Sequence, residues 1–186
     1  MMLNVRERGE HVATYRWICV RLMEMLAAWV PTTPEMEVKL VFGAHIWDMA
    51  QHADVFGKRT HELRLPPQHS LKPSEDYVNF IAELGATTAT DKRIAAFYGC
   101  LLPSLERRFR RYLSRVDPML DGPTVRILER ILFDIGRMLD ESRALLAEVP
   151  DVKLADGAWV QQLCARDGVM QDIVVHQTAA QPAVVA

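Results

Sequence analysis

Residues 42–63, FGAHIWDMAQHADVFGKRTHEL, are the stretch that decides the fold. Their apolar residues recur at the helical period of about 3.6 residues, which predicts one long amphipathic helix. His45 and His52 fall near the centre of the apolar stripe, and Asp48 lies just to one side of it. Buried imidazole and carboxylate groups cost free energy unless they are paired, ligated or catalytic. The stretch therefore predicts a helical protein and the place of its functional site.

The same periodicity recurs in the rest of the chain, and no stretch in its body shows sustained strand-like alternation. The four long helices that we expect cover residues 9–30, 33–64, 91–116 and 121–148. Thr33 is the expected cap of the second helix, with Pro34 in its first turn. Pro103 is expected to kink the third helix, because its ring displaces a backbone hydrogen bond.

The connections between these helices predict the topology. Turns are short between the first and second helices and between the third and fourth, whereas residues 65–90 form a long crossover. Within it, Ser74 and Gly85 bound a short helix. We expect an all-α up-down four-helix bundle with one crossover, the connectivity of ferritin-like folds, over residues 1–150. Residues 151–186 are expected to form an extension with one short helix and a frayed tail.

Composition narrows the class of protein. The 186 residues are 49% hydrophobic and 25% charged, which fits a globular domain. A net charge of -2 gives no general attraction for nucleic acid or an anionic membrane, and we expect neither as a partner. No signal peptide or apolar membrane span is evident, and the three cysteines are widely spaced without a CxxC pair. We therefore expect a cytoplasmic protein with reduced thiols.

The strongest basic cluster is ERRFRRYLSR in the third predicted helix. Its arginines at 107, 108, 111 and 115 mostly fall away from the apolar stripe. We interpret them as an ordinary solvated face, with an anionic ligand or partner as the minority alternative.

The spacing of the candidate residues limits what they can do together. His45 and Asp48 are separated by three residues and Asp48 and His52 by four, so the carboxylate can orient either imidazole or share a metal ion with one of them. The two histidines are about 10 Å apart along a helix, so one ion bound by both is the less favoured arrangement. Tyr98 and Tyr112 face inward from the third helix and can hydrogen-bond an oxyanion.

The fourth predicted helix argues against a complete di-iron site. Its central inward positions are Ile135 and Met138, which cannot replace a carboxylate and an imidazole as ligands for iron or manganese. Asp134 lies at the margin of that stripe. Glu24 of the first helix is expected to be exposed.

Three segments together resemble bacterial ferritin-like proteins of largely unassigned function: HIWDMAQHADVFGKRTHELR, FYGCLLPSLERRFRRYL and VDPMLDGPTVRILERILFD. The resemblance spans residues 16–148. It implies a metal-binding bundle with a Glu near Asp48, a His at His52 and a Glu-x-x-His stretch on the fourth helix. Here His52 matches and Asp48 is a shorter acid, whereas Ile135 and Met138 depart from the pattern.

Three functional hypotheses remain open. The first is a ferritin-like biosynthetic or metabolic enzyme without a cofactor, which moves a proton on a small organic substrate with His45, Asp48 and His52, assisted by Tyr98 or Tyr112. The second is an oxidoreductase or oxygenase with iron or manganese bound by Asp48 and His52, together with acids such as Asp134 or Glu24. The third is a non-catalytic bundle that forms a homodimer through its tryptophans at 17, 29 and 47 and its aromatic helix faces.

Overall fold

Four long helices carry the fold. The structure is a computed structural model that describes residues 2–149, 152 and 155–176. In chain order, the helices are α1 (Val5–Trp29), η1 (Val30–Thr32), α2 (Met36–Glu62), α3 (Glu75–Gly85), α4 (Thr90–Ile94), the π-helical segment η2 (Ala95–Leu101), α5 (Leu102–Leu113), α6 (Gly122–Glu148) and α7 (Gly157–Val169). No strand occurs among the described residues, which confirms the predicted all-α class.

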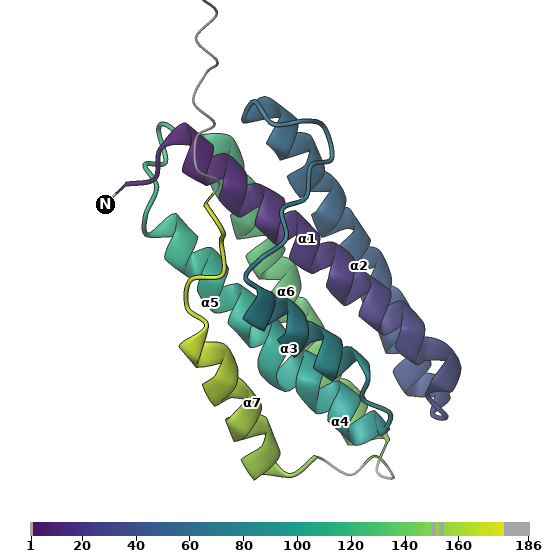
Figure 1. The fold of residues 1–186 in the computed structure, drawn as a ribbon. Coiled ribbons are helices and arrows are strands. Elements are labelled where there is room, and N and C mark those ends of the chain that lie inside the picture. The colour runs from purple at the N-terminus through teal and green to yellow at the C-terminus, as the bar shows by residue number, and fades with distance from the viewer. Residues whose placement is uncertain (1, 150–151, 153–154, 177–186) are drawn as a thin grey trace, which may run out of the picture.

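The long helices form a ring in which α1 packs on α2, α2 on α6 and α6 on α5 (Figure 1). Tyr15 of α1 and Phe109 of α5 close this ring, with their ring centroids 4.9 Å apart. α1 and α2 run in opposite directions, whereas α2 and α5 run in the same direction, since the segment containing α3 carries the chain back along the bundle (Figure 1). This is the long crossover expected from the sequence.

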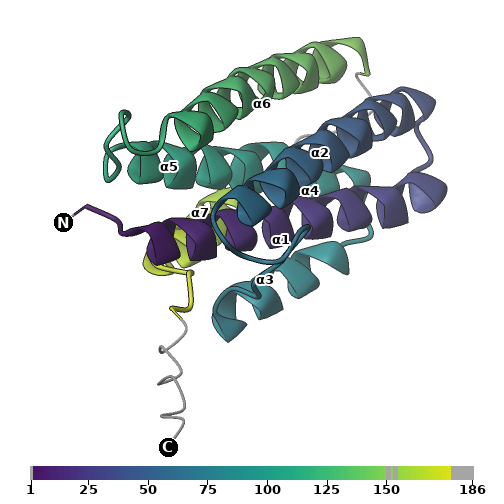
Figure 2. The same ribbon diagram turned by 90° about the horizontal axis from the view of Figure 1, so that it is seen from above.

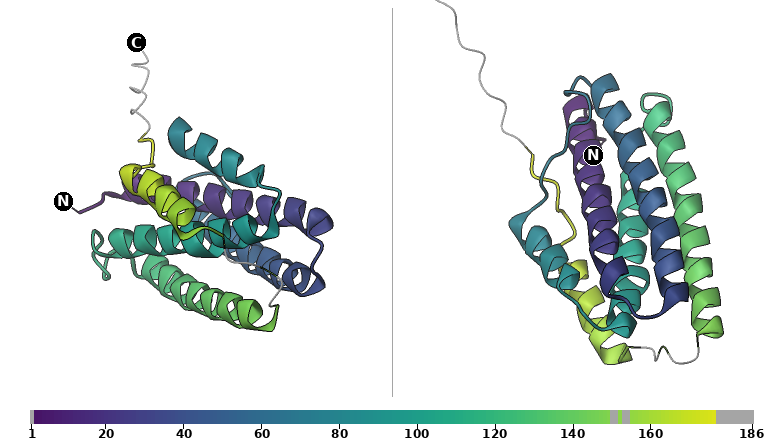
Figure 3. Two further views of the ribbon diagram at one scale, coloured as in Figure 1. Left: turned by 90° about the horizontal axis from the view of Figure 1, so that it is seen from below. Right: turned by 90° about the vertical axis from the view of Figure 1, so that its right-hand side faces the viewer.

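The two accessory helices lie on one side of the bundle. Figure 2 and Figure 3 show α3 beside α1, and α7 beside the helix formed by η2 and α5, both away from α2 and α6. Within the described part of the chain, no further helix covers the outer face of α2 and α6. That face carries the exposed apolar side chains of Leu40, Trp47 and Phe133.

The starts of α1 and α2 differ from the sequence-based boundaries. α1 begins at Val5, four residues early, because Asn4 accepts from the backbone N–H of Glu7 and the Glu7 carboxylate accepts from the backbone N–H of Asn4. Thr33 does not cap α2, which begins only at Met36. Its hydroxyl donates to the Trp29 carbonyl instead, so it secures the end of α1.

The third predicted helix is divided into α4, η2 and α5. Pro103 has no N–H to donate to the carbonyl of Gly99, and the wide π-helical turn of η2 precedes it. The Gly99 carbonyl instead accepts from the Cys164 thiol of α7, with sulfur and oxygen 3.5 Å apart. The irregularity expected at Pro103 is therefore present as a wide turn, and α7 packs against it.

α6 begins where the sequence predicted, and α7 is the short helix expected in the C-terminal extension. α6 follows Asp121, although the Asp121 carboxylate makes no capping hydrogen bond to the helix backbone. α7 follows Asp156, whose side chain accepts from the backbone N–H of Ala158. The frayed tail expected from the sequence lies outside the described residues beyond His176. No helix in the described part of the chain is both long enough and apolar enough to span a membrane.

Candidate functional site

His45 is fully buried in the middle of α2, and both of its ring nitrogens are engaged. Nδ1 is 2.6 Å from the hydroxyl of Tyr98, which η2 supplies. Nε2 is 2.8 Å from Oε2 of Glu141 on α6. Three helical segments thus hold the imidazole in one orientation.

The surroundings of Tyr98, His45 and Glu141 determine which atoms carry the protons in their hydrogen bonds. Burial lowers the pKa of His45 even though the hydrogen bond with Glu141 acts in the opposite direction. Burial also raises the pKa of Tyr98 well above its usual value, so the phenol keeps its proton. A neutral imidazole has one donor and one acceptor nitrogen, so Tyr98 donates to Nδ1 and the Nε2–H of His45 donates to Glu141.

Arg137 of α6 extends the network from Glu141 to Asp48, the acid that the sequence predicted for this site. Its Nη1 lies 2.9 Å from Oε1 of Glu141, and its Nη2 lies 2.9 Å from Oδ1 of Asp48. These two hydrogen bonds raise the pKa of Arg137. Partial burial acts to raise the pKa of Glu141, but the hydrogen bonds from His45 and Arg137 outweigh it and lower that pKa. Glu141 is therefore held as an anion, and it shares one guanidinium group with the Asp48 carboxylate.

His52 forms a separate pair with Asp134 of α6. Its Nε2 is 3.1 Å from Oδ2 of Asp134. Burial lowers the pKa of His52, so the neutral ring donates its Nε2–H to the carboxylate, while the buried Nδ1 has no hydrogen-bond partner in the described part of the chain. The imidazole is only 3% exposed, whereas the side chain of Asp134 is 25% exposed. The carboxylate is the member of the pair that solvent and a ligand can reach.

Asp134 opens onto a groove of about 500 Å³ between α2 and α6. Trp47, Val55, Ile127 and Ile131 supply its apolar wall. Its polar lining comprises Asp48, Gln51, His52, Arg126, Arg130 and Asp134. This volume falls within the range of small-molecule sites, and the mixture of an apolar wall with a few polar groups is typical of them.

A second groove of about 480 Å³ lies along the same two helices. Glu141 lines this second groove, and Asp48 lines the first one. Arg137 joins these two carboxylates. The guanidinium therefore crosses between α2 and α6 where the two grooves approach each other.

The donor set does not fit a resident iron or manganese ion. Among the described residues, no three His, Cys, Asp or Glu side chains are grouped closely enough to hold a metal. Asp48 and Glu141 share a guanidinium, which already supplies the positive charge between them. Ile135 and Met138 are fully buried, as predicted, and Glu24 is exposed and paired with Arg21. We therefore derive no chemical step through a metal.

Tyr112 does not join the group around His45. Its hydroxyl donates to Oδ2 of the fully buried Asp121, 2.6 Å away. The Arg59 guanidinium donates to Oδ1 of the same carboxylate at 2.8 Å. Tyr112 follows Tyr98 by fourteen positions, about 20 Å along a helix. It belongs to a buried polar network that ties α2 and α5 to the start of α6.

Sequence reasoning missed Arg137 and Glu141 of α6, and it named Asp134 only as a marginal acid and possible metal ligand. We expected Asp48 to orient a histidine, but the acids that contact the two imidazoles are Asp134 and Glu141. Asp134, Arg137 and Glu141 recur at intervals of three and four residues, which places them on one helix face. That spacing was the available signal, although the three residues lie beside the central apolar stripe that contains Ile135 and Met138.

The arginine-rich run of α5 is also less exposed than predicted. Arg108 is buried, and its guanidinium donates to Oδ1 of Asp167 at 2.8 Å and to the carbonyl of Met170 at 2.8 Å. Arg107 donates to the other Asp167 oxygen at 2.9 Å. The covering elements, α7 and the segment after it, follow α5 by some fifty residues, so the periodicity of α5 alone could not reveal them.

Comparison with known proteins adds no assignment, since no family model, curated protein or solved structure matches the chain.

Proposed function

We propose that the protein is an enzyme on a ferritin-like bundle that binds a small organic molecule between α2 and α6 and transfers a proton on it. The observation that carries the proposal is the His52–Asp134 pair in the wall of the groove of about 500 Å³. The ring of four long helices and the single crossover support the ferritin-like placement.

In this proposal Asp134 is the general base. Its partly exposed carboxylate can reach a ligand in the groove, whereas the buried His52 holds it through the Nε2–H. Asp134 takes a proton from a carbon beside a carbonyl group, the electron pair of that C–H bond forms a C=C bond to the carbonyl carbon, and the π pair of the carbonyl moves to its oxygen to give an enolate. Return of a proton to another carbon, or loss of a leaving group, completes an isomerisation or an elimination. His45 and Tyr98 act as positioning residues, because they hold Glu141 and, through it, Arg137.

The groove also indicates the substrate class. Arg126 and Arg130 line it, and neither forms an ion pair within the described part of the chain. Free guanidinium groups bind carboxylates, and the apolar wall formed by Trp47 and Ile131 suits a hydrocarbon or aromatic body. We propose an organic acid that carries a ketone and an apolar group.

Proton exchange at a carbon atom gives a direct test. With 2-oxo-4-phenylbutyrate in heavy water, NMR measures how fast the hydrogens beside the ketone are replaced by deuterium. The wild-type protein is expected to accelerate exchange, and Asp134→Asn to slow it by about a hundredfold or more. Asp140→Asn, on the exposed side of α6 and paired with Arg143, is the matched control and should behave as wild type. Exchange no faster than in buffer, or an Asp134→Asn rate equal to wild type, would refute the proposal.

A non-catalytic dimer is the second candidate, because one observation favours it. Leu40, Trp47 and Phe133 are all more than half exposed on the uncovered face of α2 and α6. Exposed apolar patches of this kind mark contact surfaces. Sedimentation equilibrium tests it: a dimer that Trp47→Lys or Phe133→Lys converts to a monomer would support this function, and a wild-type monomer would exclude it.

A further inference from the structure

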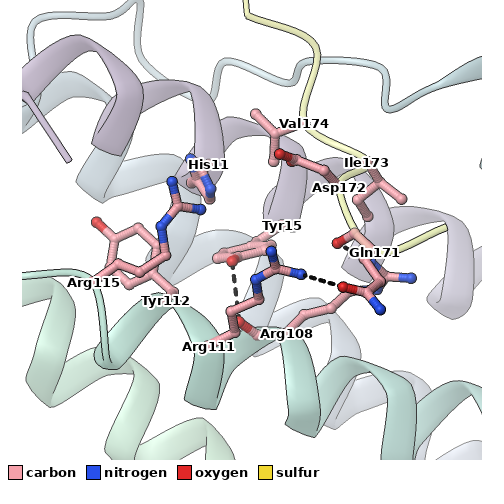
Figure 4. Close-up of a pocket in the computed structure, with 10 residues that line it drawn as sticks. All are labelled: His11, Tyr15, Arg108, Arg111, Tyr112, Arg115, Gln171, Asp172, Ile173 and Val174. Atoms are coloured by element: carbon pink, nitrogen blue, oxygen red, sulfur yellow. Dashed lines mark hydrogen bonds between the residues drawn. The ribbon is translucent and has the colours of Figure 1, made fainter. Parts of the chain in front are cut away.

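A separate cavity, distinct from both grooves between α2 and α6, lies between α1, α5 and residues 171–174 (Figure 4). The buried rings of His11, Tyr15 and Tyr112 line it. Its inner space is small, about 20 Å³, room for little more than a water molecule or the head of a ligand. A neighbouring groove of about 220 Å³ shares Arg108 and Arg111 with it. The two spaces together suit a ligand with a small head and a larger body.

The cavity is positively charged. Arg111 and Arg115 form no ion pair within the described residues, and the only partner of the Arg111 guanidinium is the side chain of Gln171, 3.3 Å away. Figure 4 shows Arg115 beside the His11 ring, with Arg111 directed toward Gln171 on the other side of Tyr15. Asp172 is the acid that lines the cavity, and it forms no ion pair with either arginine. Unpaired guanidinium groups that converge on one cavity are typical of oxyanion sites.

His11 adds a polar atom with no partner. The backbone carbonyl of Glu7 lies 2.8 Å from Nδ1, so Nδ1 carries a proton and donates it. Nε2 has no hydrogen-bond partner in the described part of the chain, and the residue is 4% exposed. Burial lowers the pKa of His11, so the free ring is neutral, and a proton taken up on Nε2 would turn that atom into a donor for an anion.

The neighbouring groove carries an unpartnered polar atom as well. Ser104 is 1% exposed and lines this groove, and its hydroxyl has no hydrogen-bond partner in the described residues. Buried hydroxyl groups are normally hydrogen-bonded, so an unpaired one beside a cavity indicates a missing partner. A polar group on the body of a ligand would supply it.

We propose that this cavity binds the oxyanion head, carboxylate or phosphoryl, of a small organic ligand, with Arg111, Arg115 and protonated His11 as its donors. The body of the ligand lies in the groove beside Ser104. The site is independent of the α2–α6 groove and shares no lining residue with it.

The test uses simple anions and the ring resonances of His11 in NMR, at constant ionic strength set with chloride. Titration with sulfate, phosphate or acetate is expected to shift the His11 resonances and to reach saturation. Arg111→Gln and Arg115→Gln should each weaken binding about tenfold or more, which corresponds to one charged hydrogen bond. Arg143→Gln removes an exposed arginine elsewhere and should change nothing. Preference for sulfate and phosphate over acetate would assign a phosphoryl head, and the reverse a carboxylate.

Acidity gives an independent readout, because sulfate remains a dianion across the range in which histidine titrates. Binding of sulfate should be tighter at about pH 5.5 than at about pH 8, since the bound anion favours protonated His11. The groups that face His11 are Arg115, Asp172, His176, Tyr15 and Tyr112, with Glu10 bonded to His176. His11→Gln should remove the pH dependence, whereas His176→Gln should leave it.

Two results would overturn the proposal. The first is a wild-type titration that does not saturate with any of the anions. The second is binding that Arg111→Gln with Arg115→Gln leaves unchanged. Arg111 is exposed and Arg115 is half-buried, and neither forms an ion pair within the described residues, so these variants are expected to fold, and an unchanged melting temperature verifies it. Neither result depends on the proton-exchange test of the α2–α6 groove.

Discussion

Acidification should destabilise the protein through its buried histidines. His11, His45 and His52 are at most 4% exposed, and burial lowers the pKa of each below the usual 6.5. In the unfolded chain the same rings take up protons near 6.5, so the unfolded state binds more protons than the folded state below that pH. Stability is therefore full above about pH 6.5 and is lost as the pH falls toward the folded-state pKa values.

The size of the effect follows from the number of protons excluded. Each ring that stays neutral in the folded state while it is charged in the unfolded state lowers the free energy of unfolding by about 1.4 kcal/mol per pH unit. Three such rings set an upper limit of about 4 kcal/mol per unit. The observed slope will be smaller, because Glu141 beside His45 and Asp134 beside His52 favour the charged imidazoles. The lowered pKa of Glu141 affects stability only below the usual value of 4.5, which is more acidic than the pH range in which the histidines titrate.

Urea unfolding followed by circular dichroism, repeated from about pH 7.5 to about pH 5, measures this slope. His45→Gln and His52→Gln should each reduce this slope by up to about 1.4 kcal/mol per pH unit, the contribution of one proton, whatever they do to the absolute stability. His61→Gln, at an exposed position of α2, is the control and should keep the wild-type slope. A free energy of unfolding that stays constant or rises as the pH falls from 7 would refute the reasoning, as would a slope that neither buried-histidine variant changes.

Two further predictions concern stability. Asp121→Ala should lower the free energy of unfolding by about 3 kcal/mol, because the Tyr112 hydroxyl loses its acceptor and the buried Arg59 guanidinium keeps only the exposed Glu62 as an ion-pair partner; Asp121→Asn should cost less, and equal effects in urea unfolding would contradict the ion-pair explanation. Gly136→Ala should raise stability by about 0.5–1 kcal/mol, since the residue is exposed within α6 and a methyl group there meets no atom within 4 Å. A lower melting temperature for that variant would contradict the second prediction.

Local signals in the sequence predicted most of the helices but not all of their ends. Apolar periodicity located α1, α2 and α6, and proline or glycine marked several boundaries. Thr33 misled because its hydroxyl is used by α1 and by Arg93, sixty residues later in the chain. A capping residue is recognised by its own neighbourhood, so a distant partner that claims its side chain is invisible to this kind of reasoning.

The site was predictable on one helix and not across two. The stripe of α2 placed His45 and His52 inward, where the structure has them, because burial follows from the helical period. Which acid meets which imidazole depends on the rotation and axial offset of α6 against α2. Asp134 and Glu141 each lie one residue before a buried position of α6, Ile135 and Ser142, and only the packing of the two helices turns both acids toward the histidines.

Arg137 explains how two carboxylates can face each other between α2 and α6 in this chain. Two anions in a partly buried groove repel each other unless a cation lies between them. Here the cation is part of α6 itself, and it contacts Asp48 and Glu141 at the same distance of 2.9 Å. Because a guanidinium remains charged at any physiological pH, this compensation needs no bound ion. The central positions of α6 can then be apolar, as Ile135 and Met138 are, and His52 and Asp134 remain beside a groove in which an organic ligand can lie.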